Sequence, residues 1–215
     1  MDSLVAFYPL LAIVAAYLVG SLSFAVIVSR AMGLNDPRTF GSKNPGATNV
    51  LRSGSKAAAI VTLLLDAFKG WLPVMLVKWY GAGYGLGEGT MAMVGLAAFL
   101  GHLLPVFFRF QGGKGVATAL GVLLATNWIL GLATGVTWLL IAYFFRYSSF
   151  ASLVSSVFAP VYYIFGDGVV WVTDKSVVLC IAVMSLLLIW RHAENIGRLA
   201  KGTESKLGKK KHGHH

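Results

Sequence analysis

The turn Gly112-Gly113-Lys114-Gly115 joins two apolar stretches and combines three glycines with one lysine. Glycine lets successive backbone N–H groups curl toward a bound anion, and the lysine ammonium adds a full positive charge. The composition predicts a phosphate-binding turn. It is not the Walker A loop of nucleotide hydrolases, because Gly115 stands where that motif needs a magnesium-binding Ser or Thr. The alternative is a flexible connection whose lysine lies at a membrane surface.

A second polar cluster occupies residues 41–52. It combines amide, hydroxyl and cationic side chains with a glycine that lets a ligand approach the backbone: Ser42, Lys43, Asn44, Gly46, Thr48, Asn49 and Arg52. An arginine can bind a phosphate through two N–H groups, and hydroxyl and amide groups suit the other oxygens of a polyol phosphate. The alternative is a solvated loop, although such loops usually carry more Asp and Glu.

A third cluster runs from residue 191 to residue 204. His192 and Asn195 are three residues apart, so a helix places both side chains on one face. His192 could donate to a phosphate, orient a substrate hydroxyl or move a proton near neutral pH. The alternative is an interfacial histidine within a basic segment that stops membrane insertion.

Asp66 and Lys69 are ionisable residues three apart inside an apolar stretch. Unpaired charge is costly in a membrane, so we expect an intrahelical ion pair that faces the bundle interior. A metal site is not expected, because no His, Cys, Asp or Glu spacing matches one. Cys180 is the single cysteine, which excludes an intrachain disulfide.

The composition identifies a membrane protein. Hydrophobic residues make up 57% of the 215 residues and charged residues only 12%, and mean hydropathy is +0.73. A soluble domain carries about 25% charged residues. The predicted fold is therefore an all-α, polytopic integral membrane helix bundle, with one transmembrane domain over 1–204. Residues 205–215 are expected to form a disordered basic, His-rich tail.

About seven transmembrane helices are expected, some of them short. A bilayer core needs about 20 apolar residues per helix, and shorter helices are tolerated inside a bundle. Four long candidates are Val5–Ser29, Ala57–Tyr80, Thr90–Phe108 and Ser176–Trp190, and three short ones lie near 116–126, 128–145 and 150–165. A count of five is the alternative if the short segments are re-entrant.

The charge distribution predicts the orientation. With seven spans, one side receives 15 of the 18 basic residues, and the other side receives only Lys78 and Lys175, against four acidic residues. The positive-inside rule then places the N-terminus outside and the C-terminus in the cytoplasm. All three polar clusters emerge on the cytoplasmic side. The net charge of +10 therefore indicates membrane topology rather than binding to nucleic acid.

Together, the clusters resemble the bacterial membrane family of acyl-phosphate:glycerol-3-phosphate acyltransferases, over nearly the whole chain. The residues that carry the resemblance are 17–21, Gly41-Ser42, Asn44, 46–49, Arg52, Asp66, Lys69-Gly70, Gly101-His102, Pro105, 112–118, His192, Asn195 and Glu204. One departure is Ser23, where the family usually has a proline that would kink the first helix.

The resemblance implies transfer of an acyl group from acyl phosphate to the 1-hydroxyl of sn-glycerol 3-phosphate. The products are 1-acyl-sn-glycerol 3-phosphate and inorganic phosphate, in the first acylation of bacterial phospholipid synthesis. It implies no cofactor and no nucleic-acid partner. It also implies a monomer in the cytoplasmic (inner) membrane, in contact with lipid and functionally coupled to the enzyme that makes acyl phosphate.

The site is expected to combine residues from all three clusters. The expected catalytic residues are Ser42, Arg52, Lys114, His192 and Asn195. Expected substrate or phosphate ligands are Asn44, Gly46, Thr48, Asn49, Gly112, Gly113, Gly115 and Ser149, and expected supporting residues are Asp66, Lys69, His102 and Glu204. Either His192 or a substrate phosphate could act as the general base.

Two rival functions use the same features. A transporter or channel for a phosphorylated solute would share the bundle and the basic sites, but it predicts polar residues that reach both membrane faces. The outer side has few polar residues beyond short acidic loops. A non-catalytic lipid-binding or scaffold protein leaves the three clusters of asparagine, glycine and basic residues unexplained.

Overall fold

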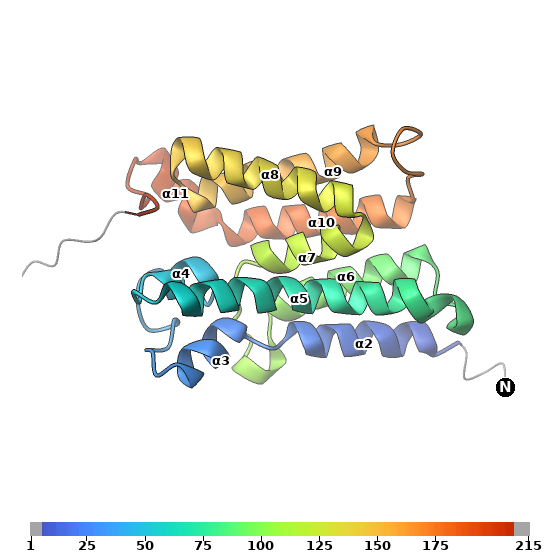
Figure 1. Ribbon diagram of the computed structural model, residues 1–215, viewed down its shortest axis with the longest axis horizontal. Helices are drawn as coiled ribbons and strands as arrows, with labels where there is room; N and C mark the ends of the chain where they lie inside the picture. The colour runs from blue at the N-terminus through green and yellow to red at the C-terminus, as the bar shows by residue number, and fades with distance from the viewer. Residues whose placement is uncertain (1–5, 209–215) are drawn as a thin grey trace, which may run out of the picture.

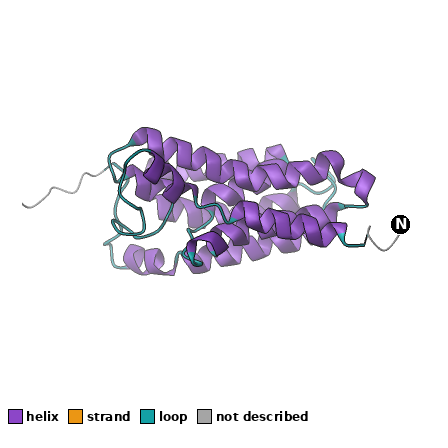
Figure 2. Ribbon diagram, turned by 90° about the horizontal axis from the view of Figure 1, so that it is seen from below, coloured by secondary structure: helices purple, strands orange, loops and turns teal. Residues whose placement is uncertain are grey.

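The computed structural model describes residues 6–208, which form helices joined by loops. Within this range there is no β-strand, only one isolated bridge between Asp167 and Trp171. The helices lie roughly along one common axis, and the loops gather at the two ends of the bundle (Figure 2). The predicted all-α bundle is confirmed.

The first predicted span is bent rather than straight. It consists of α2 (Tyr8–Gly20) and α3 (Phe24–Ala31), whose axes differ by 42°. Ser23 has φ −83° and ψ 86°, outside the helical region, so the helix is interrupted here. The bend therefore forms with serine at the position where a proline was expected.

The remaining helices follow in an up-and-down order (Figure 1). They are α4 (Ala47–Leu51), α5 (Lys56–Tyr80), η1 (Gly81–Tyr84), α6 (Glu88–Leu103), η2 (Val106–Phe108), α7 (Val116–Thr126), α8 (Trp128–Phe145), α9 (Ser148–Phe165), α10 (Lys175–Arg191) and α11 (Ala193–Ala200). The boundaries of α7 and α8 coincide with those expected from the sequence.

Four of these helices are long and apolar enough to cross a membrane. The number rises to six if the bent pairs α2–α3 and α10–α11 each count as one span. With 11 residues, α7 is only about 16 Å long, about half of a hydrocarbon core of about 30 Å. The expected count of seven therefore depends on α7 and stays a prediction.

Glycines allow close packing between the helices. A Cβ atom on Gly101 of α6 would overlap the Tyr17 carbonyl of α2, and one on Gly121 of α7 would overlap the Ala67 carbonyl of α5. Such small residues are typical of membrane interfaces, where the close approach of helix backbones provides much of the packing energy. Both contacts position α6 and α7, which flank the Gly112–Gly115 turn.

The two ends of the bundle differ in charge. The start of α2 lies at one end, whereas α3, α4 and α11 lie at the other (Figure 1). We call the latter the basic end. Its segments 30–56, 104–115, 146–149 and 191–208 contain 12 basic and three acidic residues. All three predicted polar clusters therefore share one end of the molecule.

Contacts with the helical domain continue beyond the expected boundary at residue 204. The Leu207 N–H donates to the Arg146 carbonyl at 2.7 Å, and Arg146 Nη2 donates to the Leu207 carbonyl at 3.0 Å. Ser205 Oγ accepts a hydrogen bond from Arg52. Residues 205 and 207 thus contact the helical domain, the expected boundary at 204 stays a prediction, and residues 209–215 lie outside the described range.

Candidate active site

Three residues, one from the glycine turn and two from the third cluster, are linked by hydrogen bonds at the basic end. Lys114, just before α7, donates from Nζ to Asn195 Oδ1 in α11. The other end of the same amide, Asn195 Nδ2, donates to Glu204 Oε1 at 2.6 Å. The donor at Oδ1 and the acceptor at Nδ2 require the same orientation of the Asn195 amide. The glycine turn and the third sequence cluster are thereby joined.

Glu204 is the shared acceptor of this network. In addition to Asn195 it accepts hydrogen bonds from Ser149 Oγ and from Arg198 Nε, both at 2.7 Å. Its side chain is only 6% exposed. Burial opposes ionisation, but the hydrogen bonds from Arg198, Ser149 and Asn195 outweigh it and hold the pKa of the carboxyl below its usual value. Glu204 is therefore a carboxylate that orients its neighbours.

The Lys114 ammonium lies in an environment that weakens its positive charge. Burial, followed by the nearby Arg198, lowers the pKa of Lys114 to about 8. No carboxylate lies within 4.0 Å of Lys114 among residues 6–208. A bound phosphate would supply the missing negative charge, so the lysine is suited to an anionic ligand.

The glycine turn is held from three sides. Arg191 donates to the Gly112 and Gly113 carbonyls, and the Gly113 N–H donates to the His102 carbonyl at 3.1 Å. A Cβ on Gly113 would overlap His102 Nε2 and approach the Pro45 carbonyl at 2.5 Å. Only glycine therefore fits between these groups. The contact with Pro45 also brings the second cluster, residues 41–52, to the turn.

The turn leads directly into the N-terminus of α7. Gly115 has φ +82°, a conformation that favours glycine, and no side chain caps the helix. The first backbone N–H groups of a helix have no partner within it, and the helix dipole is positive there. This end of α7 therefore has the features of an anion-binding site.

His192 follows the last residue of α10 and is 2% exposed. Its Nδ1 lies 2.8 Å from the Leu188 carbonyl, which can only accept, so Nδ1 carries the proton and Nε2 keeps a lone pair. Burial, reinforced by the charge of Lys114, lowers the pKa of His192 to about 4. The imidazole is therefore neutral near pH 7 and offers an acceptor at Nε2.

Within the second cluster, residues 41–52, Asn49 shapes the loop. Its Nδ2 donates to the Pro37 carbonyl at 2.6 Å and to the Phe40 carbonyl at 3.2 Å, and its Oδ1 accepts from the Ser42 N–H at 3.1 Å. The side chain is 2% exposed. The structure therefore shows that Asn49 supports the fold of the loop, and its expected contact with a ligand stays a prediction.

The other expected residues of this loop are more accessible. Ser42 and Thr48 are exposed, Asn44 is half-buried, and Gly46 precedes α4 in an extended conformation with φ −169°. Arg52 is exposed, donates to Ser205 Oγ at 2.7 Å, and lines a depression of about 320 Å³ with Gly33, Leu34, Asn35, Phe40 and Ser53.

The expected intrahelical ion pair is present beneath the turn. Lys69 Nζ lies 2.8 Å from Asp66 Oδ1 and donates to the Leu22 carbonyl at 2.7 Å. His102 Nδ1 lies 3.6 Å from the same carboxylate oxygen, too far for a hydrogen bond. Because the other edge of the His102 ring contacts Gly113, these buried charges support the turn from the membrane interior.

Sequence reasoning missed two arginines of the site. Arg191 binds the glycine turn and Arg198 binds Glu204. Both resembled ordinary basic residues at the end of a span. The spacing of Asn195 and Arg198, three apart on one helix, was the available signal for Arg198. No such signal exists for the Arg191 contacts, which join residues 78 and 79 apart in sequence.

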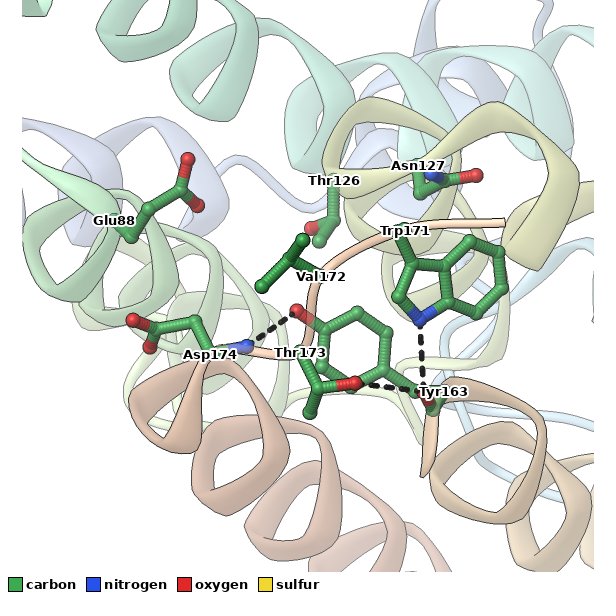
Figure 3. Close-up of a pocket in the computed structure, with 8 residues that line it drawn as sticks. All are labelled: Glu88, Thr126, Asn127, Tyr163, Trp171, Val172, Thr173 and Asp174. Atoms are coloured by element: carbon green, nitrogen blue, oxygen red, sulfur yellow. Dashed lines mark hydrogen bonds between the residues drawn. The ribbon is translucent and has the colours of Figure 1, made fainter. Parts of the chain in front are cut away.

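A second depression lies where α6 begins and where α7 and α9 end, and Figure 3 shows the residues that line it. Its volume is about 350 Å³, and its lining is Glu88, Thr126, Asn127, Tyr163, Trp171, Val172, Thr173 and Asp174. Trp171 Nε1 donates to the Tyr163 carbonyl at 2.8 Å, and the Asp174 N–H donates to the Tyr163 hydroxyl at 3.3 Å. None of the expected site residues contributes to it.

Comparison with known proteins gives one consistent result. The glycerol-3-phosphate acyltransferase family model matches residues 10–202. A glycerol-3-phosphate acyltransferase of Albidiferax ferrireducens is 73% identical over 98% of this chain and 94% of its own length. A glycerol-3-phosphate acyltransferase of Burkholderia pseudomallei is 63% identical over 94% of this chain and 97% of its own length.

Solved structures agree with the sequence matches. The glycerol 3-phosphate form of PlsY (YgiH), an integral membrane glycerol 3-phosphate acyltransferase, has a TM-score of 0.85 and 36% identity, covering 93% of this chain and 96% of that one. Its lysophosphatidic acid form has a TM-score of 0.83 and covers 93% and 95%. The chain therefore belongs to the glycerol-3-phosphate acyltransferase family.

Proposed function

We propose that this protein transfers the acyl group of an acyl phosphate to the 1-hydroxyl of sn-glycerol 3-phosphate. The products are 1-acyl-sn-glycerol 3-phosphate and inorganic phosphate. Acylation of glycerol 3-phosphate is the activity of the family to which the chain belongs, and two similar structures are a glycerol 3-phosphate form and a lysophosphatidic acid form. The use of acyl phosphate as donor and of the 1-hydroxyl as acceptor are proposed in addition to this family activity.

One observation carries the proposal. The Lys114 ammonium and the glycine turn lie beside His192 and Asn195, which puts phosphate-binding groups and a hydroxyl-orienting group in one site. Both proposed substrates carry phosphate. A site rich in cations and backbone N–H groups and poor in free carboxylates suits two anionic substrates better than one.

The proposed reaction needs little covalent chemistry from the protein. The glycerol hydroxyl oxygen attacks the acyl carbonyl carbon, the bond from that carbon to the phosphate oxygen breaks, and phosphate leaves with the electron pair. An acyl phosphate is a mixed anhydride with a good leaving group. Positioning of the substrates and neutralisation of their charge by Arg52 and Lys114 can therefore supply much of the acceleration.

The hydroxyl proton goes to a substrate phosphate in this proposal. A phosphate monoester has a second pKa of about 6, so it is a better base than His192, whose pKa is about 4. His192 Nε2 instead accepts a hydrogen bond from the neighbouring 2-hydroxyl, which orients the glycerol and leaves the proton of the 1-hydroxyl for the phosphate. Ser42 and Ser149 are further polar groups for the two phosphates.

Topology and assembly belong to the same proposal. The excess of basic residues at the basic end supports a cytoplasmic active site in the inner membrane, with the N-terminus outside. The acyl chain would lie between helices, in contact with lipid. We propose a monomer, with a single catalytic domain over 1–204, that receives acyl phosphate from the enzyme that makes it.

The decisive experiment is a reconstituted assay. Purified protein in lipid receives acyl phosphate and labelled glycerol 3-phosphate, and both lysophosphatidate and released phosphate are measured. Equal amounts of the two products are expected, with no product when acyl-CoA replaces acyl phosphate. The Lys114→Met variant is the inactive control. Well-folded wild-type protein that forms no lysophosphatidate would exclude the enzyme, and product from acyl-CoA alone would exclude the proposed donor.

A further inference from the structure

Arg191, the last residue of α10, binds two consecutive carbonyl groups of the glycine turn. Its Nη2 donates to the Gly112 carbonyl at 2.8 Å, and its Nε donates to the Gly113 carbonyl at 3.1 Å. The rigid fork of a guanidinium suits two such acceptors, whereas a lysine ammonium is a single point of contact. The turn is therefore clamped by one side chain from a different helix.

The clamp determines which way the backbone N–H groups of the turn point. In a trans peptide the C=O and the following N–H point in opposite directions. Because the Gly113 carbonyl faces Arg191, the Lys114 N–H faces away from it. That N–H has no hydrogen-bond acceptor among residues 6–208, whereas the Gly113 N–H already donates to His102. The Lys114 N–H thus remains available to a ligand.

Arg191 also differs from other arginines of the basic end in its charge balance. Arg38 and Arg198 each form an ion pair with a carboxylate, at 2.7 Å in both cases. Within residues 6–208, no carboxylate oxygen lies within 4.0 Å of Arg191, which is half-buried. Besides the two carbonyls, its guanidinium lies 5.9 Å from the centre of the Trp190 ring, and neither kind of partner carries a negative charge. A partly buried cation of this kind is unfavourable unless an anion offsets its charge.

We propose that Arg191 is a positioning residue for the glycine turn. It holds the backbone in the conformation that presents the Lys114 N–H to the phosphate of glycerol 3-phosphate, and its unneutralised charge strengthens that binding. Its role is indirect, because the N–H groups that face the turn, on Nε and Nη2, are bonded to the Gly113 and Gly112 carbonyls. This inference rests on the proposed function, since it assumes that glycerol 3-phosphate is a substrate.

The test compares three variants by calorimetric titration with glycerol 3-phosphate in the absence of acyl donor. Arg191→Lys keeps the charge and loses the fork, so we expect about tenfold or greater loss of affinity, as for loss of one charged hydrogen bond. Arg191→Met loses the charge as well and should bind more weakly still. Arg146→Lys is the matched control, because Arg146 also donates to a backbone carbonyl, that of Leu207, but not to the turn.

Steady-state kinetics supply a readout that a general loss of stability would not move. In Arg191→Lys the KM for glycerol 3-phosphate should rise about tenfold while kcat at saturation stays within about threefold of wild type. An unchanged dissociation constant and KM in Arg191→Lys would overturn the inference. Wild-type protein that neither binds glycerol 3-phosphate nor forms product would overturn the proposed function, which is a distinguishable result.

A measurement on wild-type protein covers the case in which the variants do not fold. Hydrogen exchange of a peptide over 112–117 should slow when glycerol 3-phosphate is added, because the Lys114 N–H gains an acceptor. A peptide within α8 is the internal control and should not change. If the exchange rate over 112–117 does not change when glycerol 3-phosphate is added, the Lys114 N–H does not bind this ligand and the inference is contradicted.

Discussion

The Lys114 ammonium donates a hydrogen bond to Asn195 Oδ1, across 81 residues of sequence. An amide accepts this bond without neutralising the lysine, so burial lowers the pKa of Lys114 to about 8 and the charge is easily lost. A deprotonated lysine no longer attracts a phosphate. The network therefore links substrate affinity to pH.

We predict that the KM for glycerol 3-phosphate rises several-fold as pH increases through 8 to about 9.5, as Lys114 loses its proton in the free enzyme. Lys114→Arg should have a flat KM over this range, because the guanidinium stays charged. Asn195→Asp places a carboxylate beside the ammonium, raises the pKa of Lys114, and should move the increase in KM to higher pH. A wild-type KM that is constant up to pH 10 would refute the prediction.

Replacement of Glu204 should be costly. Its carboxylate accepts three hydrogen bonds, and each bond to a charged group contributes about 1.5–3 kcal/mol. We expect Glu204→Ala to lower both the midpoint of thermal unfolding in detergent and kcat/KM, with a smaller loss in Glu204→Gln. The matched control is Glu194→Gln, because Glu194 is 88% exposed and 3.6 Å from Arg198. Equal effects at the two positions would argue against a buried network.

Titration of His192 should not contribute to the pH dependence of kcat. The pKa of His192 is about 4, so the imidazole does not titrate between about pH 5.5 and 8. His192→Asn should lower kcat by about ten- to a hundredfold through poorer orientation of the hydroxyl, while the shape of the pH profile is preserved. Disappearance of the acidic limb in this variant would identify His192 as the base instead.

Arg52 and Ser205 allow a test of the proposed phosphate contact. Arg52 Nη2 donates to Ser205 Oγ at 2.7 Å, and both residues are exposed. If Arg52 binds phosphate, Ser205→Ala should leave the KM of both substrates within about threefold, whereas Arg52→Met should raise one KM by about tenfold or more. Measurement of both KM values also shows which substrate Arg52 contacts. Arg52→Met with unchanged kinetics would remove Arg52 from the site.

The packing of α7 on α5 should be sensitive to a single methyl group. Gly121→Ala would place a Cβ against the Ala67 carbonyl, and we expect it to lower the free energy of unfolding by about 1–3 kcal/mol. Gly135→Ala in α8 is the control, because its Cβ would make only an ordinary 3.5 Å contact with Leu120. It should leave the unfolding midpoint unchanged or raise it. A similar midpoint for both variants would mean that α5 and α7 separate easily.

Helix positions could be predicted because long apolar runs have few structural alternatives. The expected span 57–80 corresponds to α5 at Lys56–Tyr80, and the breaks at Asn127 and Arg146 were visible as polar interruptions. The angle between α2 and α3 was not predictable, because Gly20, Ser21 and Ser23 interrupt the apolar run only briefly and give no direction to the bend. A hydropathy profile measures burial in lipid and contains no information on helix axes.

The polar clusters of the candidate site could be located in the sequence, but the hydrogen bonds between them could not. Glycine, asparagine and arginine in apolar surroundings indicated where ligands bind. The hydrogen bond between Ser149 and Glu204 joins residues 55 apart, and no local pattern specifies it. Asn49 illustrates a second limit, since its residue type fits a ligand but only the folded loop shows that its amide bonds to backbone groups of residues 37–42. Residue types limit the chemistry, whereas tertiary packing decides which groups are left to perform it.

The polar network from Lys114 to Glu204 has a consequence for biogenesis. Lys114 and Ser149 are synthesised before Asn195 and Glu204, the partners to which they donate, which lie in the last segment of the site to leave the ribosome. A nascent chain inserted as far as α9 therefore has most of the bundle and an incomplete site. The enzyme would remain silent during translation and become active only when α10 and α11 dock, so that incomplete products of translation cannot consume acyl donor.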